Sequence, residues 1–458
     1  MNDDDGLLSL PGPRIGFDVA LGLAAAIPTL AGAAFGAWLA LDDWSFAAAA
    51  RFNTFTQGFG TQTRQRPLSG VSDWTLFHLF GTHPVPHLMV LAVLNAAAAV
   101  LLWHLLDRWL PRRIAALTAV AWVALPNRGS TRLWVTTTPL VLSLVLLLAA
   151  LFVASGVPFT GRRLGAAIGL VVLSALAYEG GIGIGVAGLL AVVWTRAPSG
   201  RRLRWSAATV GVIGAVGGWV LLSSPKVGTS PPPFRNLSHL TSAHFGDAVL
   251  SNRFVAAIVL GAVAWCVAVV LLPHFEAWLE QKLVVVGLGV ILLGSAPFVV
   301  VGFPFSSSGF FDRGNLYANL GTALVYGSLL AMLFRLRWRA VAIAAAVLAL
   351  AGIAAPNVRS VHAYTRAGRD GRRLLAAMDQ LPVGLRTRGP VTFLPLRDYD
   401  GVATFLADYD ISAALALRYN TGEPFPRAAM AVTATGFKGA QGPVYRFAGG
   451  RLVLVPQS

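Results

Sequence analysis

The chain has 458 residues, of which 55% are hydrophobic and only 12% are charged. A soluble protein carries roughly 25% charged residues, so this composition excludes an ordinary soluble enzyme. The formal net charge of +16 would suggest a nucleic-acid partner in a soluble domain. Here much of the basic excess lies in short loops between apolar runs, where it orients a membrane protein and faces anionic headgroups. We therefore expect the lipid bilayer as a partner, and no nucleic acid.

Apolar runs recur along the chain, and each is long enough to cross the ~30 Å hydrocarbon core of a bilayer. The first run follows an acidic leader and is longer than the apolar part of a signal peptide, so we expect it to be retained. The predicted fold class is a polytopic α-helical membrane protein with about eleven transmembrane helices. They are predicted at residues 16–41, 85–106, 112–126, 138–156, 164–178, 180–196, 205–223, 254–273, 283–304, 317–334 and 338–355.

The charges in the loops predict the topology. With the N-terminus in the cytoplasm, the inner loops hold 13 basic and 3 acidic residues, whereas the outer loops hold 9 basic and 6 acidic. The positive-inside rule favours this orientation, and an odd number of spans places the C-terminus outside. The abundance of alanine and glycine is typical of bacterial genes rich in GC. We therefore expect a multi-pass protein of the bacterial cytoplasmic membrane.

Composition changes near residue 356. Residues 366–373 are basic and precede an amphipathic segment at 374–378, while 390–396 and 451–456 are predicted to be strands. This mixture predicts a small extracytoplasmic α/β domain at 356–458. Residues 1–355 would then form the transmembrane domain, with 42–84 as its first outer loop.

Two adjacent carboxylates, Asp42 and Asp43, directly follow the first predicted helix. Like charges side by side repel, so such a pair often manages a cation, a proton or a substrate. The outer loops supply further carboxylates and also arginines, whose planar guanidinium suits phosphate. The carboxylates are Asp73, Glu179, Asp247 and Asp312, and the arginines are Arg51, Arg64, Arg66, Arg128, Arg132 and Arg313.

Each of these residues also has an ordinary structural explanation. An outer-loop arginine commonly faces solvent or headgroups, and Asp73 could cap or face a helix of the aromatic stretch around it. His78, His83 and His87 lack the ligand pattern of a closed zinc site, which favours interfacial packing. Glu179 lies between two apolar spans, where a carboxylate needs an ion pair or a functional reason.

Several motifs occur in the order found in a known family. They are Asp42-Asp43-Trp44, Arg66-Pro67-Leu68, the stretch ending in His83-Pro84, His87 to Asn95, Asn127-Arg128 with Arg132, Tyr178-Glu179-Gly180-Gly181, and Asp312-Arg313 with Tyr317. Together they resemble the GT-C superfamily of membrane glycosyltransferases, which use sugars linked to polyprenyl phosphate. The resemblance covers residues 16 to 335. One departure is Tyr178, which stands where many members carry a lysine.

The resemblance implies an inverting glycosyltransferase with a GT-C-like transmembrane domain. Its donor would be a polyprenyl-phosphate sugar, and its acceptor a glycan, lipid or protein of the cell envelope. Asp42 or Asp43 would be the general base, with a slight preference for Asp43. Some members bind a divalent cation (Mg, Mn or Ca) beside the acidic pair, which here would place it at Asp42. Substrate-binding roles would fall to Arg66, Arg128, Arg132, Glu179, Asp312, Arg313, Trp44, Trp74 and His83.

Two other functions fit the composition. A transporter or flippase of a lipid-linked glycan would usually show inverted repeats or interrupted helices, and the sequence shows little of either. A non-catalytic assembly protein of the cell envelope would depend mainly on the segment after residue 356.

Overall fold

The structure is a computed structural model of the chain. It describes residues 14–223, 243–245, 253–271, 277–300, 306, 308–335, 338–387, 391–393, 398–405, 408–419, 443–448 and 450–455. Asp247, one of the carboxylates singled out above, lies outside the described residues.

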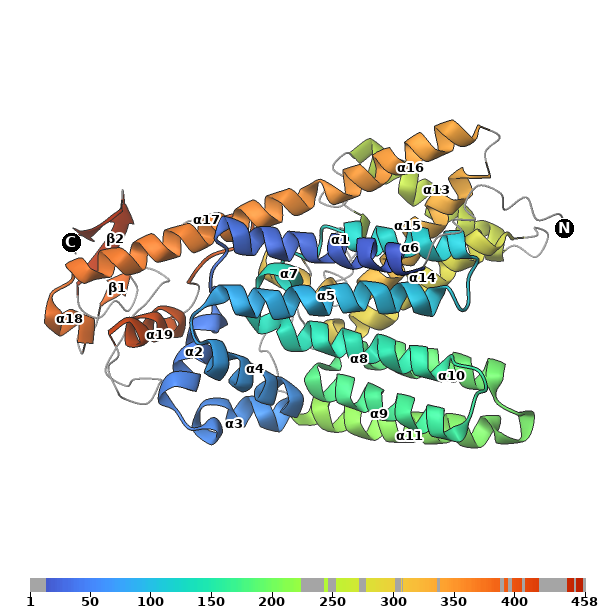
Figure 1. Ribbon diagram of the computed structural model, residues 1–458, viewed down its shortest axis with the longest axis horizontal. Helices are drawn as coiled ribbons and strands as arrows, with labels where there is room; N and C mark the ends of the chain where they lie inside the picture. Colours follow the sequence, from blue (N-terminus) through green and yellow to red (C-terminus); the bar gives the residue numbers. More distant parts are fainter. Residues whose placement is uncertain are drawn as a thin grey trace.

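A helix occupies each of the eleven predicted spans (Figure 1). These helices are α1 (Arg14–Phe35), α5 (Pro84–Leu106), α6 (Arg112–Ala124), α8 (Thr138–Ala154), α9 (Gly161–Ala177), α10 (Ile182–Arg196), α11 (Ser199–Ser223), α13 (Arg253–Leu271), α14 (Leu279–Val300), α15 (Ala318–Leu333) and α16 (Arg339–Ala354). Five helical stretches of the described chain are long and apolar enough to cross a membrane: Ile15–Phe35, Pro84–Leu106, Val135–Ala154, Leu279–Val299 and Arg339–Gln380. The helical fold class is therefore confirmed, while the number of crossings stays a prediction.

Helix α15 lies at the centre of the bundle, between α6 and α14. Its backbone approaches that of α14 closely, since a Cβ atom at Gly321 would lie 2.3 Å from the carbonyl oxygen of Gly287. Apolar helices in a membrane gain little from the hydrophobic effect between them, so small residues that allow close packing stabilise the crossing. The pair of glycines therefore determines how near α14 can come to the centre.

The first helix ends earlier than its apolar run. Gly36 has a φ of +89°, a left-handed conformation that glycine adopts readily, and it ends α1 at Phe35. The carbonyl oxygen of Gly36 accepts a hydrogen bond of 2.9 Å from Arg372 Nη1. The expectation that Asp42 and Asp43 directly follow helix one is therefore wrong, because five extended or turn residues separate them from the glycine.

The first outer loop folds into three short helices. They are α2 (Asp42–Phe52), α3 (Phe55–Gln65) and α4 (Pro67–Phe80). Asp42 and Asp43 form the first turn of α2, where the positive end of the helix dipole favours negative charge. Both carboxylates can therefore occupy adjacent positions without a bound cation to balance them.

The C-terminal segment begins inside a long helix. Helix α17 (Pro356–Ala377) continues from α16 through Ala355, and Pro356 occupies its first turn, where a missing N–H costs nothing. It projects beyond the bundle towards the small sheet (Figure 1). The predicted boundary at residue 356 thus falls within one helical stretch, and a separate domain after it stays a prediction.

Both strands predicted after residue 356 are present. Strand β1 (Thr392–Phe393) pairs in parallel with β2 (Val444–Ala448), which pairs antiparallel with β3 (Arg451–Val455). Two helices, α18 (Val383–Thr387) and α19 (Asp408–Tyr419), accompany the sheet. This part packs closely on the rest of the chain, since Leu41 N–H donates to the Thr404 carbonyl over 3.0 Å.

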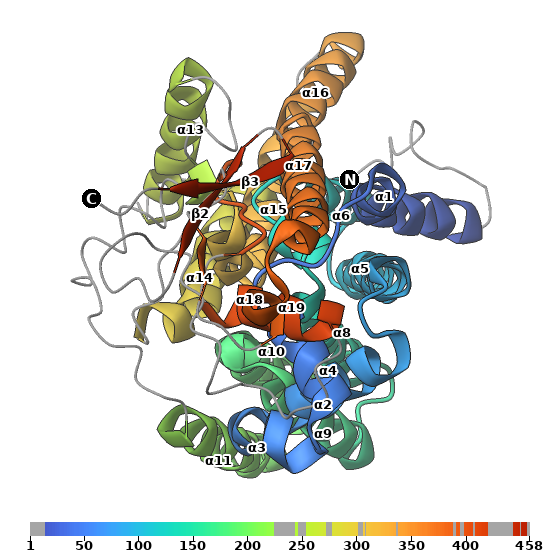
Figure 2. The ribbon, with the colours of Figure 1, turned by 90° about the vertical axis from the view of Figure 1, so that its left-hand side faces the viewer.

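The loops predicted to face outward gather at one end of the bundle. Figure 2 views that end and shows α2, α3, α4 and α19 in front of the bundle. Four short elements complete it: α7 (Ser130–Leu133), η1 (Val135–Thr137), η2 (Glu179–Gly181) and η3 (Phe310–Asn315). Hydrogen bonds join these loops to one another, and the next section describes them. Sidedness with respect to the cell stays a prediction.

Candidate active site

Asp43 is fully buried and has a structural role. Its Oδ2 atom accepts the N–H of Ala40 and its Oδ1 atom accepts the N–H of Thr136, both at 2.9 Å. Burial raises the pKa of this carboxyl well above its ordinary value, although the two hydrogen bonds act in the opposite direction. Asp43 therefore joins the start of α2 to η1, and both its oxygen atoms are occupied.

Asp42 is half-buried and can be reached from outside. Its Oδ1 atom accepts a hydrogen bond of 3.0 Å from the hydroxyl of Tyr409, on α19. A general base must come within hydrogen-bonding distance of the proton that it removes. Accessibility thus favours Asp42 over Asp43, the reverse of the slight preference drawn from the sequence.

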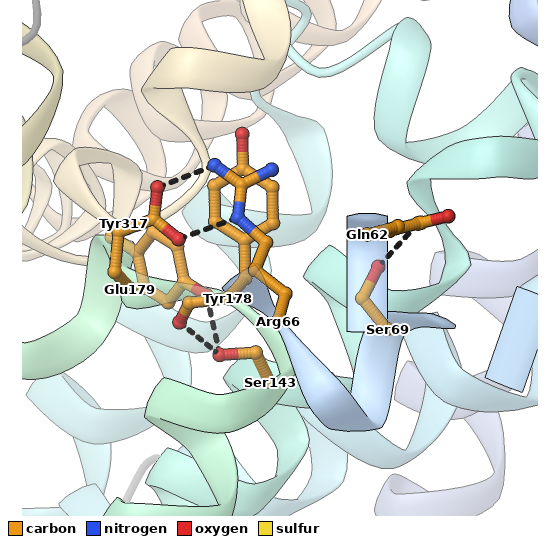
Figure 3. A network of polar contacts seen from close by, with 7 residues as sticks. All are labelled: Gln62, Arg66, Ser69, Ser143, Tyr178, Glu179 and Tyr317. Atoms are coloured by element: carbon orange, nitrogen blue, oxygen red, sulfur yellow. Dashed lines mark hydrogen bonds and ion pairs between the residues drawn. The ribbon is translucent and has the colours of Figure 1, made fainter. Parts of the chain in front are cut away.

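Arg66 and Glu179 form a two-bond ion pair (Figure 3). Arg66 Nε donates to Glu179 Oε2 over 2.7 Å, and Nη2 donates to Oε1 over 2.5 Å. The guanidinium also lies 4.2 Å from the ring centroid of Tyr178, a favourable cation–π geometry. The lysine that the family resemblance leads one to expect is thus replaced by an aromatic face that holds an arginine.

Burial lowers the pKa of Arg66, but Tyr178 and Glu179 oppose it strongly enough to raise the pKa above its ordinary value overall. Arg66 is therefore permanently charged. Its side chain is 31% exposed, against 8% for Glu179, so the cation is the more accessible partner. Of the two explanations for Glu179, the ion pair is the one that the geometry supplies.

A tyrosine behind this pair holds the turn that carries Glu179. The Tyr317 hydroxyl donates to Ser143 Oγ over 2.6 Å, and Ser143 Oγ donates to the Tyr178 carbonyl over 3.0 Å (Figure 3). A Cβ atom at Gly180 would lie 2.4 Å from the Tyr317 ring. Glycine at this position is therefore required for the tyrosine to pack against η2.

Asp73 is buried on the inner side of α4. Gln62 Nε2 donates to Asp73 Oδ2 over 2.7 Å and to Ser69 Oγ over 2.9 Å. Burial is the main cause that raises the Asp73 pKa to about 8. Asp42 raises that pKa further and Arg66 lowers it, so both charges act on the same buried carboxyl.

Asp312 fixes the short helix α7. Its Oδ2 accepts the Gly129 N–H over 2.6 Å, and its Oδ1 accepts the Ser130 N–H over 3.0 Å and the Ser130 hydroxyl. Burial raises the pKa of Asp312 to about 7 against these hydrogen bonds. The carboxylate is thus fully engaged by backbone and hydroxyl groups.

Arg128 and Arg132 are buried beside it. Arg128 donates to Asn95 Oδ1 over 2.8 Å, and Arg132 donates to the Val123 carbonyl over 2.6 Å and to Asn357. Each is 1% exposed. The hydrogen-bond acceptors named here are uncharged groups of the protein itself, so these contacts hold both arginines in the fold, and a role in phosphate binding stays a prediction.

The other residues singled out from the sequence are scattered over this end. Trp44 is buried against Phe405 at a centroid distance of 5.8 Å, and half-buried Trp74 stacks on His78 at 4.9 Å. His83 is exposed just before α5. Arg313 is half-buried, with its guanidinium 4.7 Å from the Trp134 ring centroid. Asp42 and Arg313 both act on the pKa of the Tyr409 hydroxyl: Asp42 raises it and Arg313 lowers it.

A divalent cation would find few ligands here. Among the residues that the structure describes, no three His, Cys, Asp or Glu side chains are grouped as a metal site would need. Both oxygens of Asp43 are engaged by backbone N–H groups, so Asp42 is the carboxylate of the pair that could reach a cation. The remaining ligands would have to come from substrate and water.

No family model matches the chain, and no curated protein matches it. Among solved structures it is similar to the oligosaccharyltransferase AglB of Archaeoglobus fulgidus, in complex with an inhibitory peptide and a dolichol-phosphate. The identity is 12%, the TM-score is 0.43, and the match covers 92% of this chain and 65% of that one. It is also similar to ArnT from Cupriavidus metallidurans, at 13% identity, a TM-score of 0.44 and 90% coverage of each chain.

Both are GT-C superfamily membrane glycosyltransferases. The archaeal oligosaccharyltransferase has also been solved with Zn and sulfate, and that structure shares 13% identity with this chain at a TM-score of 0.41. The chain spans less than two thirds of that oligosaccharyltransferase's length. These similarities carry no argument about activity or residue roles, which are argued from the site.

Sequence reasoning missed the residue that touches Asp42. Tyr409 lies in the segment after residue 356, which matched no family, and 367 positions separate the two residues. Nothing in the local pattern around Tyr409 marks it. Tyr317 did stand in a quoted motif, but the sequence did not reveal its contact with Ser143.

Proposed function

We propose that the protein is a membrane glycosyltransferase that transfers a sugar from a polyprenyl-phosphate donor to an extracytoplasmic acceptor of the cell envelope. One observation carries the proposal. At one end of an apolar helical bundle (Figure 2), the fold presents a reachable carboxylate, Asp42, together with an arginine, Arg66, that Glu179 fixes and whose side chain is 31% exposed. A base and a cation, at the level where a lipid phosphate would sit, are what this transfer requires.

The chemistry is a single displacement. Asp42 removes the proton of an acceptor hydroxyl, whose oxygen attacks the anomeric carbon as the bond from that carbon to the phosphate oxygen breaks. The bonding electron pair leaves on the lipid phosphate. Because attack and departure occur on opposite faces, the configuration at the anomeric carbon inverts. The donor is already activated, so the reaction needs no nucleotide.

Arg66 is the first choice for the leaving phosphate. Two of its nitrogens are engaged by Glu179, and Figure 3 shows the third pointing away from that carboxylate. The pairing fixes the guanidinium while leaving a donor for substrate. Negative charge grows on the phosphate in the transition state, so a fixed cation stabilises that state more than the ground state.

The C-terminal segment contributes to this site through Tyr409. Its hydroxyl holds one oxygen of Asp42, which leaves the other for an acceptor hydroxyl or a divalent cation. We place the site on the outer face of the bacterial cytoplasmic membrane, with the N-terminus in the cytoplasm. The larger excess of basic residues in the loops of the opposite end supports this orientation.

The test is the Asp42→Asn variant in liposomes that contain lipid extracts of the source membrane. Loss of a general base should lower the transfer rate by about 10²–10⁴-fold, while the melting temperature stays near that of the wild type because asparagine can still accept from Tyr409. Unchanged transfer by Asp42→Asn would overturn the assignment. Movement of a lipid-linked glycan across the bilayer without covalent transfer would favour a flippase instead. If the wild-type protein shows neither transfer nor transport, the non-catalytic assembly role is the remaining explanation.

A further inference from the structure

Three arginines meet at the end of the bundle away from Asp42. Arg108 follows α5, Arg163 lies in the first turn of α9, and Arg196 ends α10. They line a hollow of about 330 Å³, together with Ser155, Gly156 and Val157. All three belong to loops predicted to face the cytoplasm.

Within the described part of the chain, no carboxylate pairs with this cluster. Across the residues that the structure describes, none of the three arginines forms an ion pair, although Asp107 precedes Arg108 in the chain. Burial lowers the pKa of the Arg108 guanidinium, and the positive charges of Arg163 and Arg196 lower it further. Converging like charges cost free energy, so a ligand of opposite charge would stabilise the arrangement.

Other contacts hold the arginines in place. Arg108 Nη1 donates to the Phe152 carbonyl over 2.6 Å and to Ser155 Oγ over 3.0 Å. The Arg196 guanidinium lies 4.7 Å from the Trp109 ring centroid. Side chains fixed before binding lose less entropy on binding, which favours affinity.

Gly156 makes room for Arg163. A Cβ atom at Gly156 would lie 2.3 Å from Arg163 Nη1, so the end of this flexible side chain would have to shift if position 156 carried a side chain. One substitution can therefore move the third cation without changing charge.

A general excess of basic residues on the inner side would not explain the hollow. Arg335, at the same end, is paired with Glu280 through two bonds of 3.0 and 2.9 Å. The arginines of the hollow have no such carboxylate. Their convergence around an open volume distinguishes them from basic residues that only orient the spans.

We propose that this hollow binds the phosphate group of an anionic lipid headgroup from the leaflet at that end of the bundle. Guanidinium groups suit phosphate through paired hydrogen bonds, and basic pockets between helices are known headgroup sites. Exposed apolar side chains lie next to the hollow in the chain: Trp109 beside Arg108, and Val157, which lines it. These side chains would accompany the acyl part of the lipid. The proposal does not depend on any activity at Asp42.

The test is native mass spectrometry of the full chain after exchange into phosphatidylcholine bilayers containing phosphatidylglycerol. The variant is Arg163→Gln with Arg196→Gln, which keeps the Arg108 contacts to α8. The control is Arg162→Gln in the first turn of α9 with Arg204→Gln in α11, which removes the same charge from exposed positions outside the hollow. General electrostatic attraction to an anionic bilayer falls equally in the two double variants, because each loses two positive charges. We expect the hollow variant to bind phosphatidylglycerol roughly tenfold or more weakly than the control.

Equal affinities of the two variants would overturn the proposal. Gly156→Ala provides a second test that alters no charge: it should also weaken binding by displacing Arg163, whatever the stability of the double variant. Inorganic phosphate is the competing source. Phosphatidylglycerol retained in its presence supports the lipid, whereas phosphate binding with no preference for phosphatidylglycerol over phosphatidylcholine overturns the lipid assignment.

Discussion

The two ends of the helical bundle handle charge in opposite ways. At the end with Asp42, most of the charged side chains picked out by type are engaged by the protein: Asp43 and Asp312 by backbone N–H groups, Arg132 by carbonyl and amide oxygens. At the other end, three arginines share a hollow without a carboxylate. Charge alone therefore does not mark a site. What distinguishes a candidate binding site is whether other groups of the protein already pair with its charged side chains.

The largest expected effect tests whether Asp312 belongs to the fold. Asp312→Ala leaves the N–H groups of Gly129 and Ser130 buried without an acceptor, at a cost of about 1–3 kcal/mol for each unsatisfied group. We expect a large fall in melting temperature in detergent or nanodiscs. A normal melting temperature with impaired substrate binding would instead give Asp312 the substrate role that its sequence position suggested.

The next effect separates the two functions of Arg66. Arg66→Gln alone leaves the buried Glu179 carboxylate without its ion-pair partner, so the stability of the protein and the transfer rate should both fall. The double variant Arg66→Gln with Glu179→Gln removes both charges and should keep a melting temperature near that of the wild type. Transfer should still fall by about 10²-fold, as expected for loss of one transition-state donor. Full transfer by the double variant would restrict Arg66 to a structural role.

A smaller effect is expected from Tyr409. Tyr409→Phe deletes the hydroxyl that holds Asp42 and keeps the ring, so folding should be unchanged. Transfer should fall about tenfold, as for one hydrogen bond to a charged group, mainly in kcat. Tyr419→Phe, at the other end of α19, removes a hydroxyl that contacts Asp379; it is the matched control and should leave transfer intact.

The smallest effect concerns pH. Burial raises the Asp73 pKa to about 8 in the folded protein, above the unfolded value near 3.9. The folded state then binds a proton more tightly, so this group lowers stability as pH rises from about 4 to 8. Asp73→Asn removes the ionisable carboxyl and with it this loss of stability at higher pH. We expect its melting temperature to exceed that of the wild type by about 2 °C or more at pH 9, and the difference to vanish towards pH 4. A difference independent of pH would contradict this reasoning.

Apolar composition was enough to predict the helices. Each of the eleven runs contains one, because length and hydrophobicity are local properties of the sequence. The end of α1 was missed because a glycine in the left-handed conformation, with Arg372 bonded to its carbonyl, stops a run that is still apolar. That contact joins residues 336 positions apart.

The residues of the candidate site could be picked out by their type, but the contacts of each residue could not be predicted from the sequence. Asp42 and Arg66 were both singled out, and both lie at the end of the bundle where they were expected. Asp43 could not be distinguished from Asp42 because its burial depends on Thr136, which a distant loop supplies. Arg128 and Arg132 look like phosphate ligands in a sequence, but their acceptors come from the fold.

The helical stretch Arg339–Gln380 connects the helical bundle to the small sheet. At 1.5 Å per residue its 42 residues extend about 60 Å, twice the thickness of a hydrocarbon core. One end, α16, packs on α6 and α15, and the other, α17, packs against β3 and α19. Helix α19 also packs on α2, so inserting a single turn into the long stretch would oppose that contact and strain the hydrogen bond between Tyr409 and Asp42.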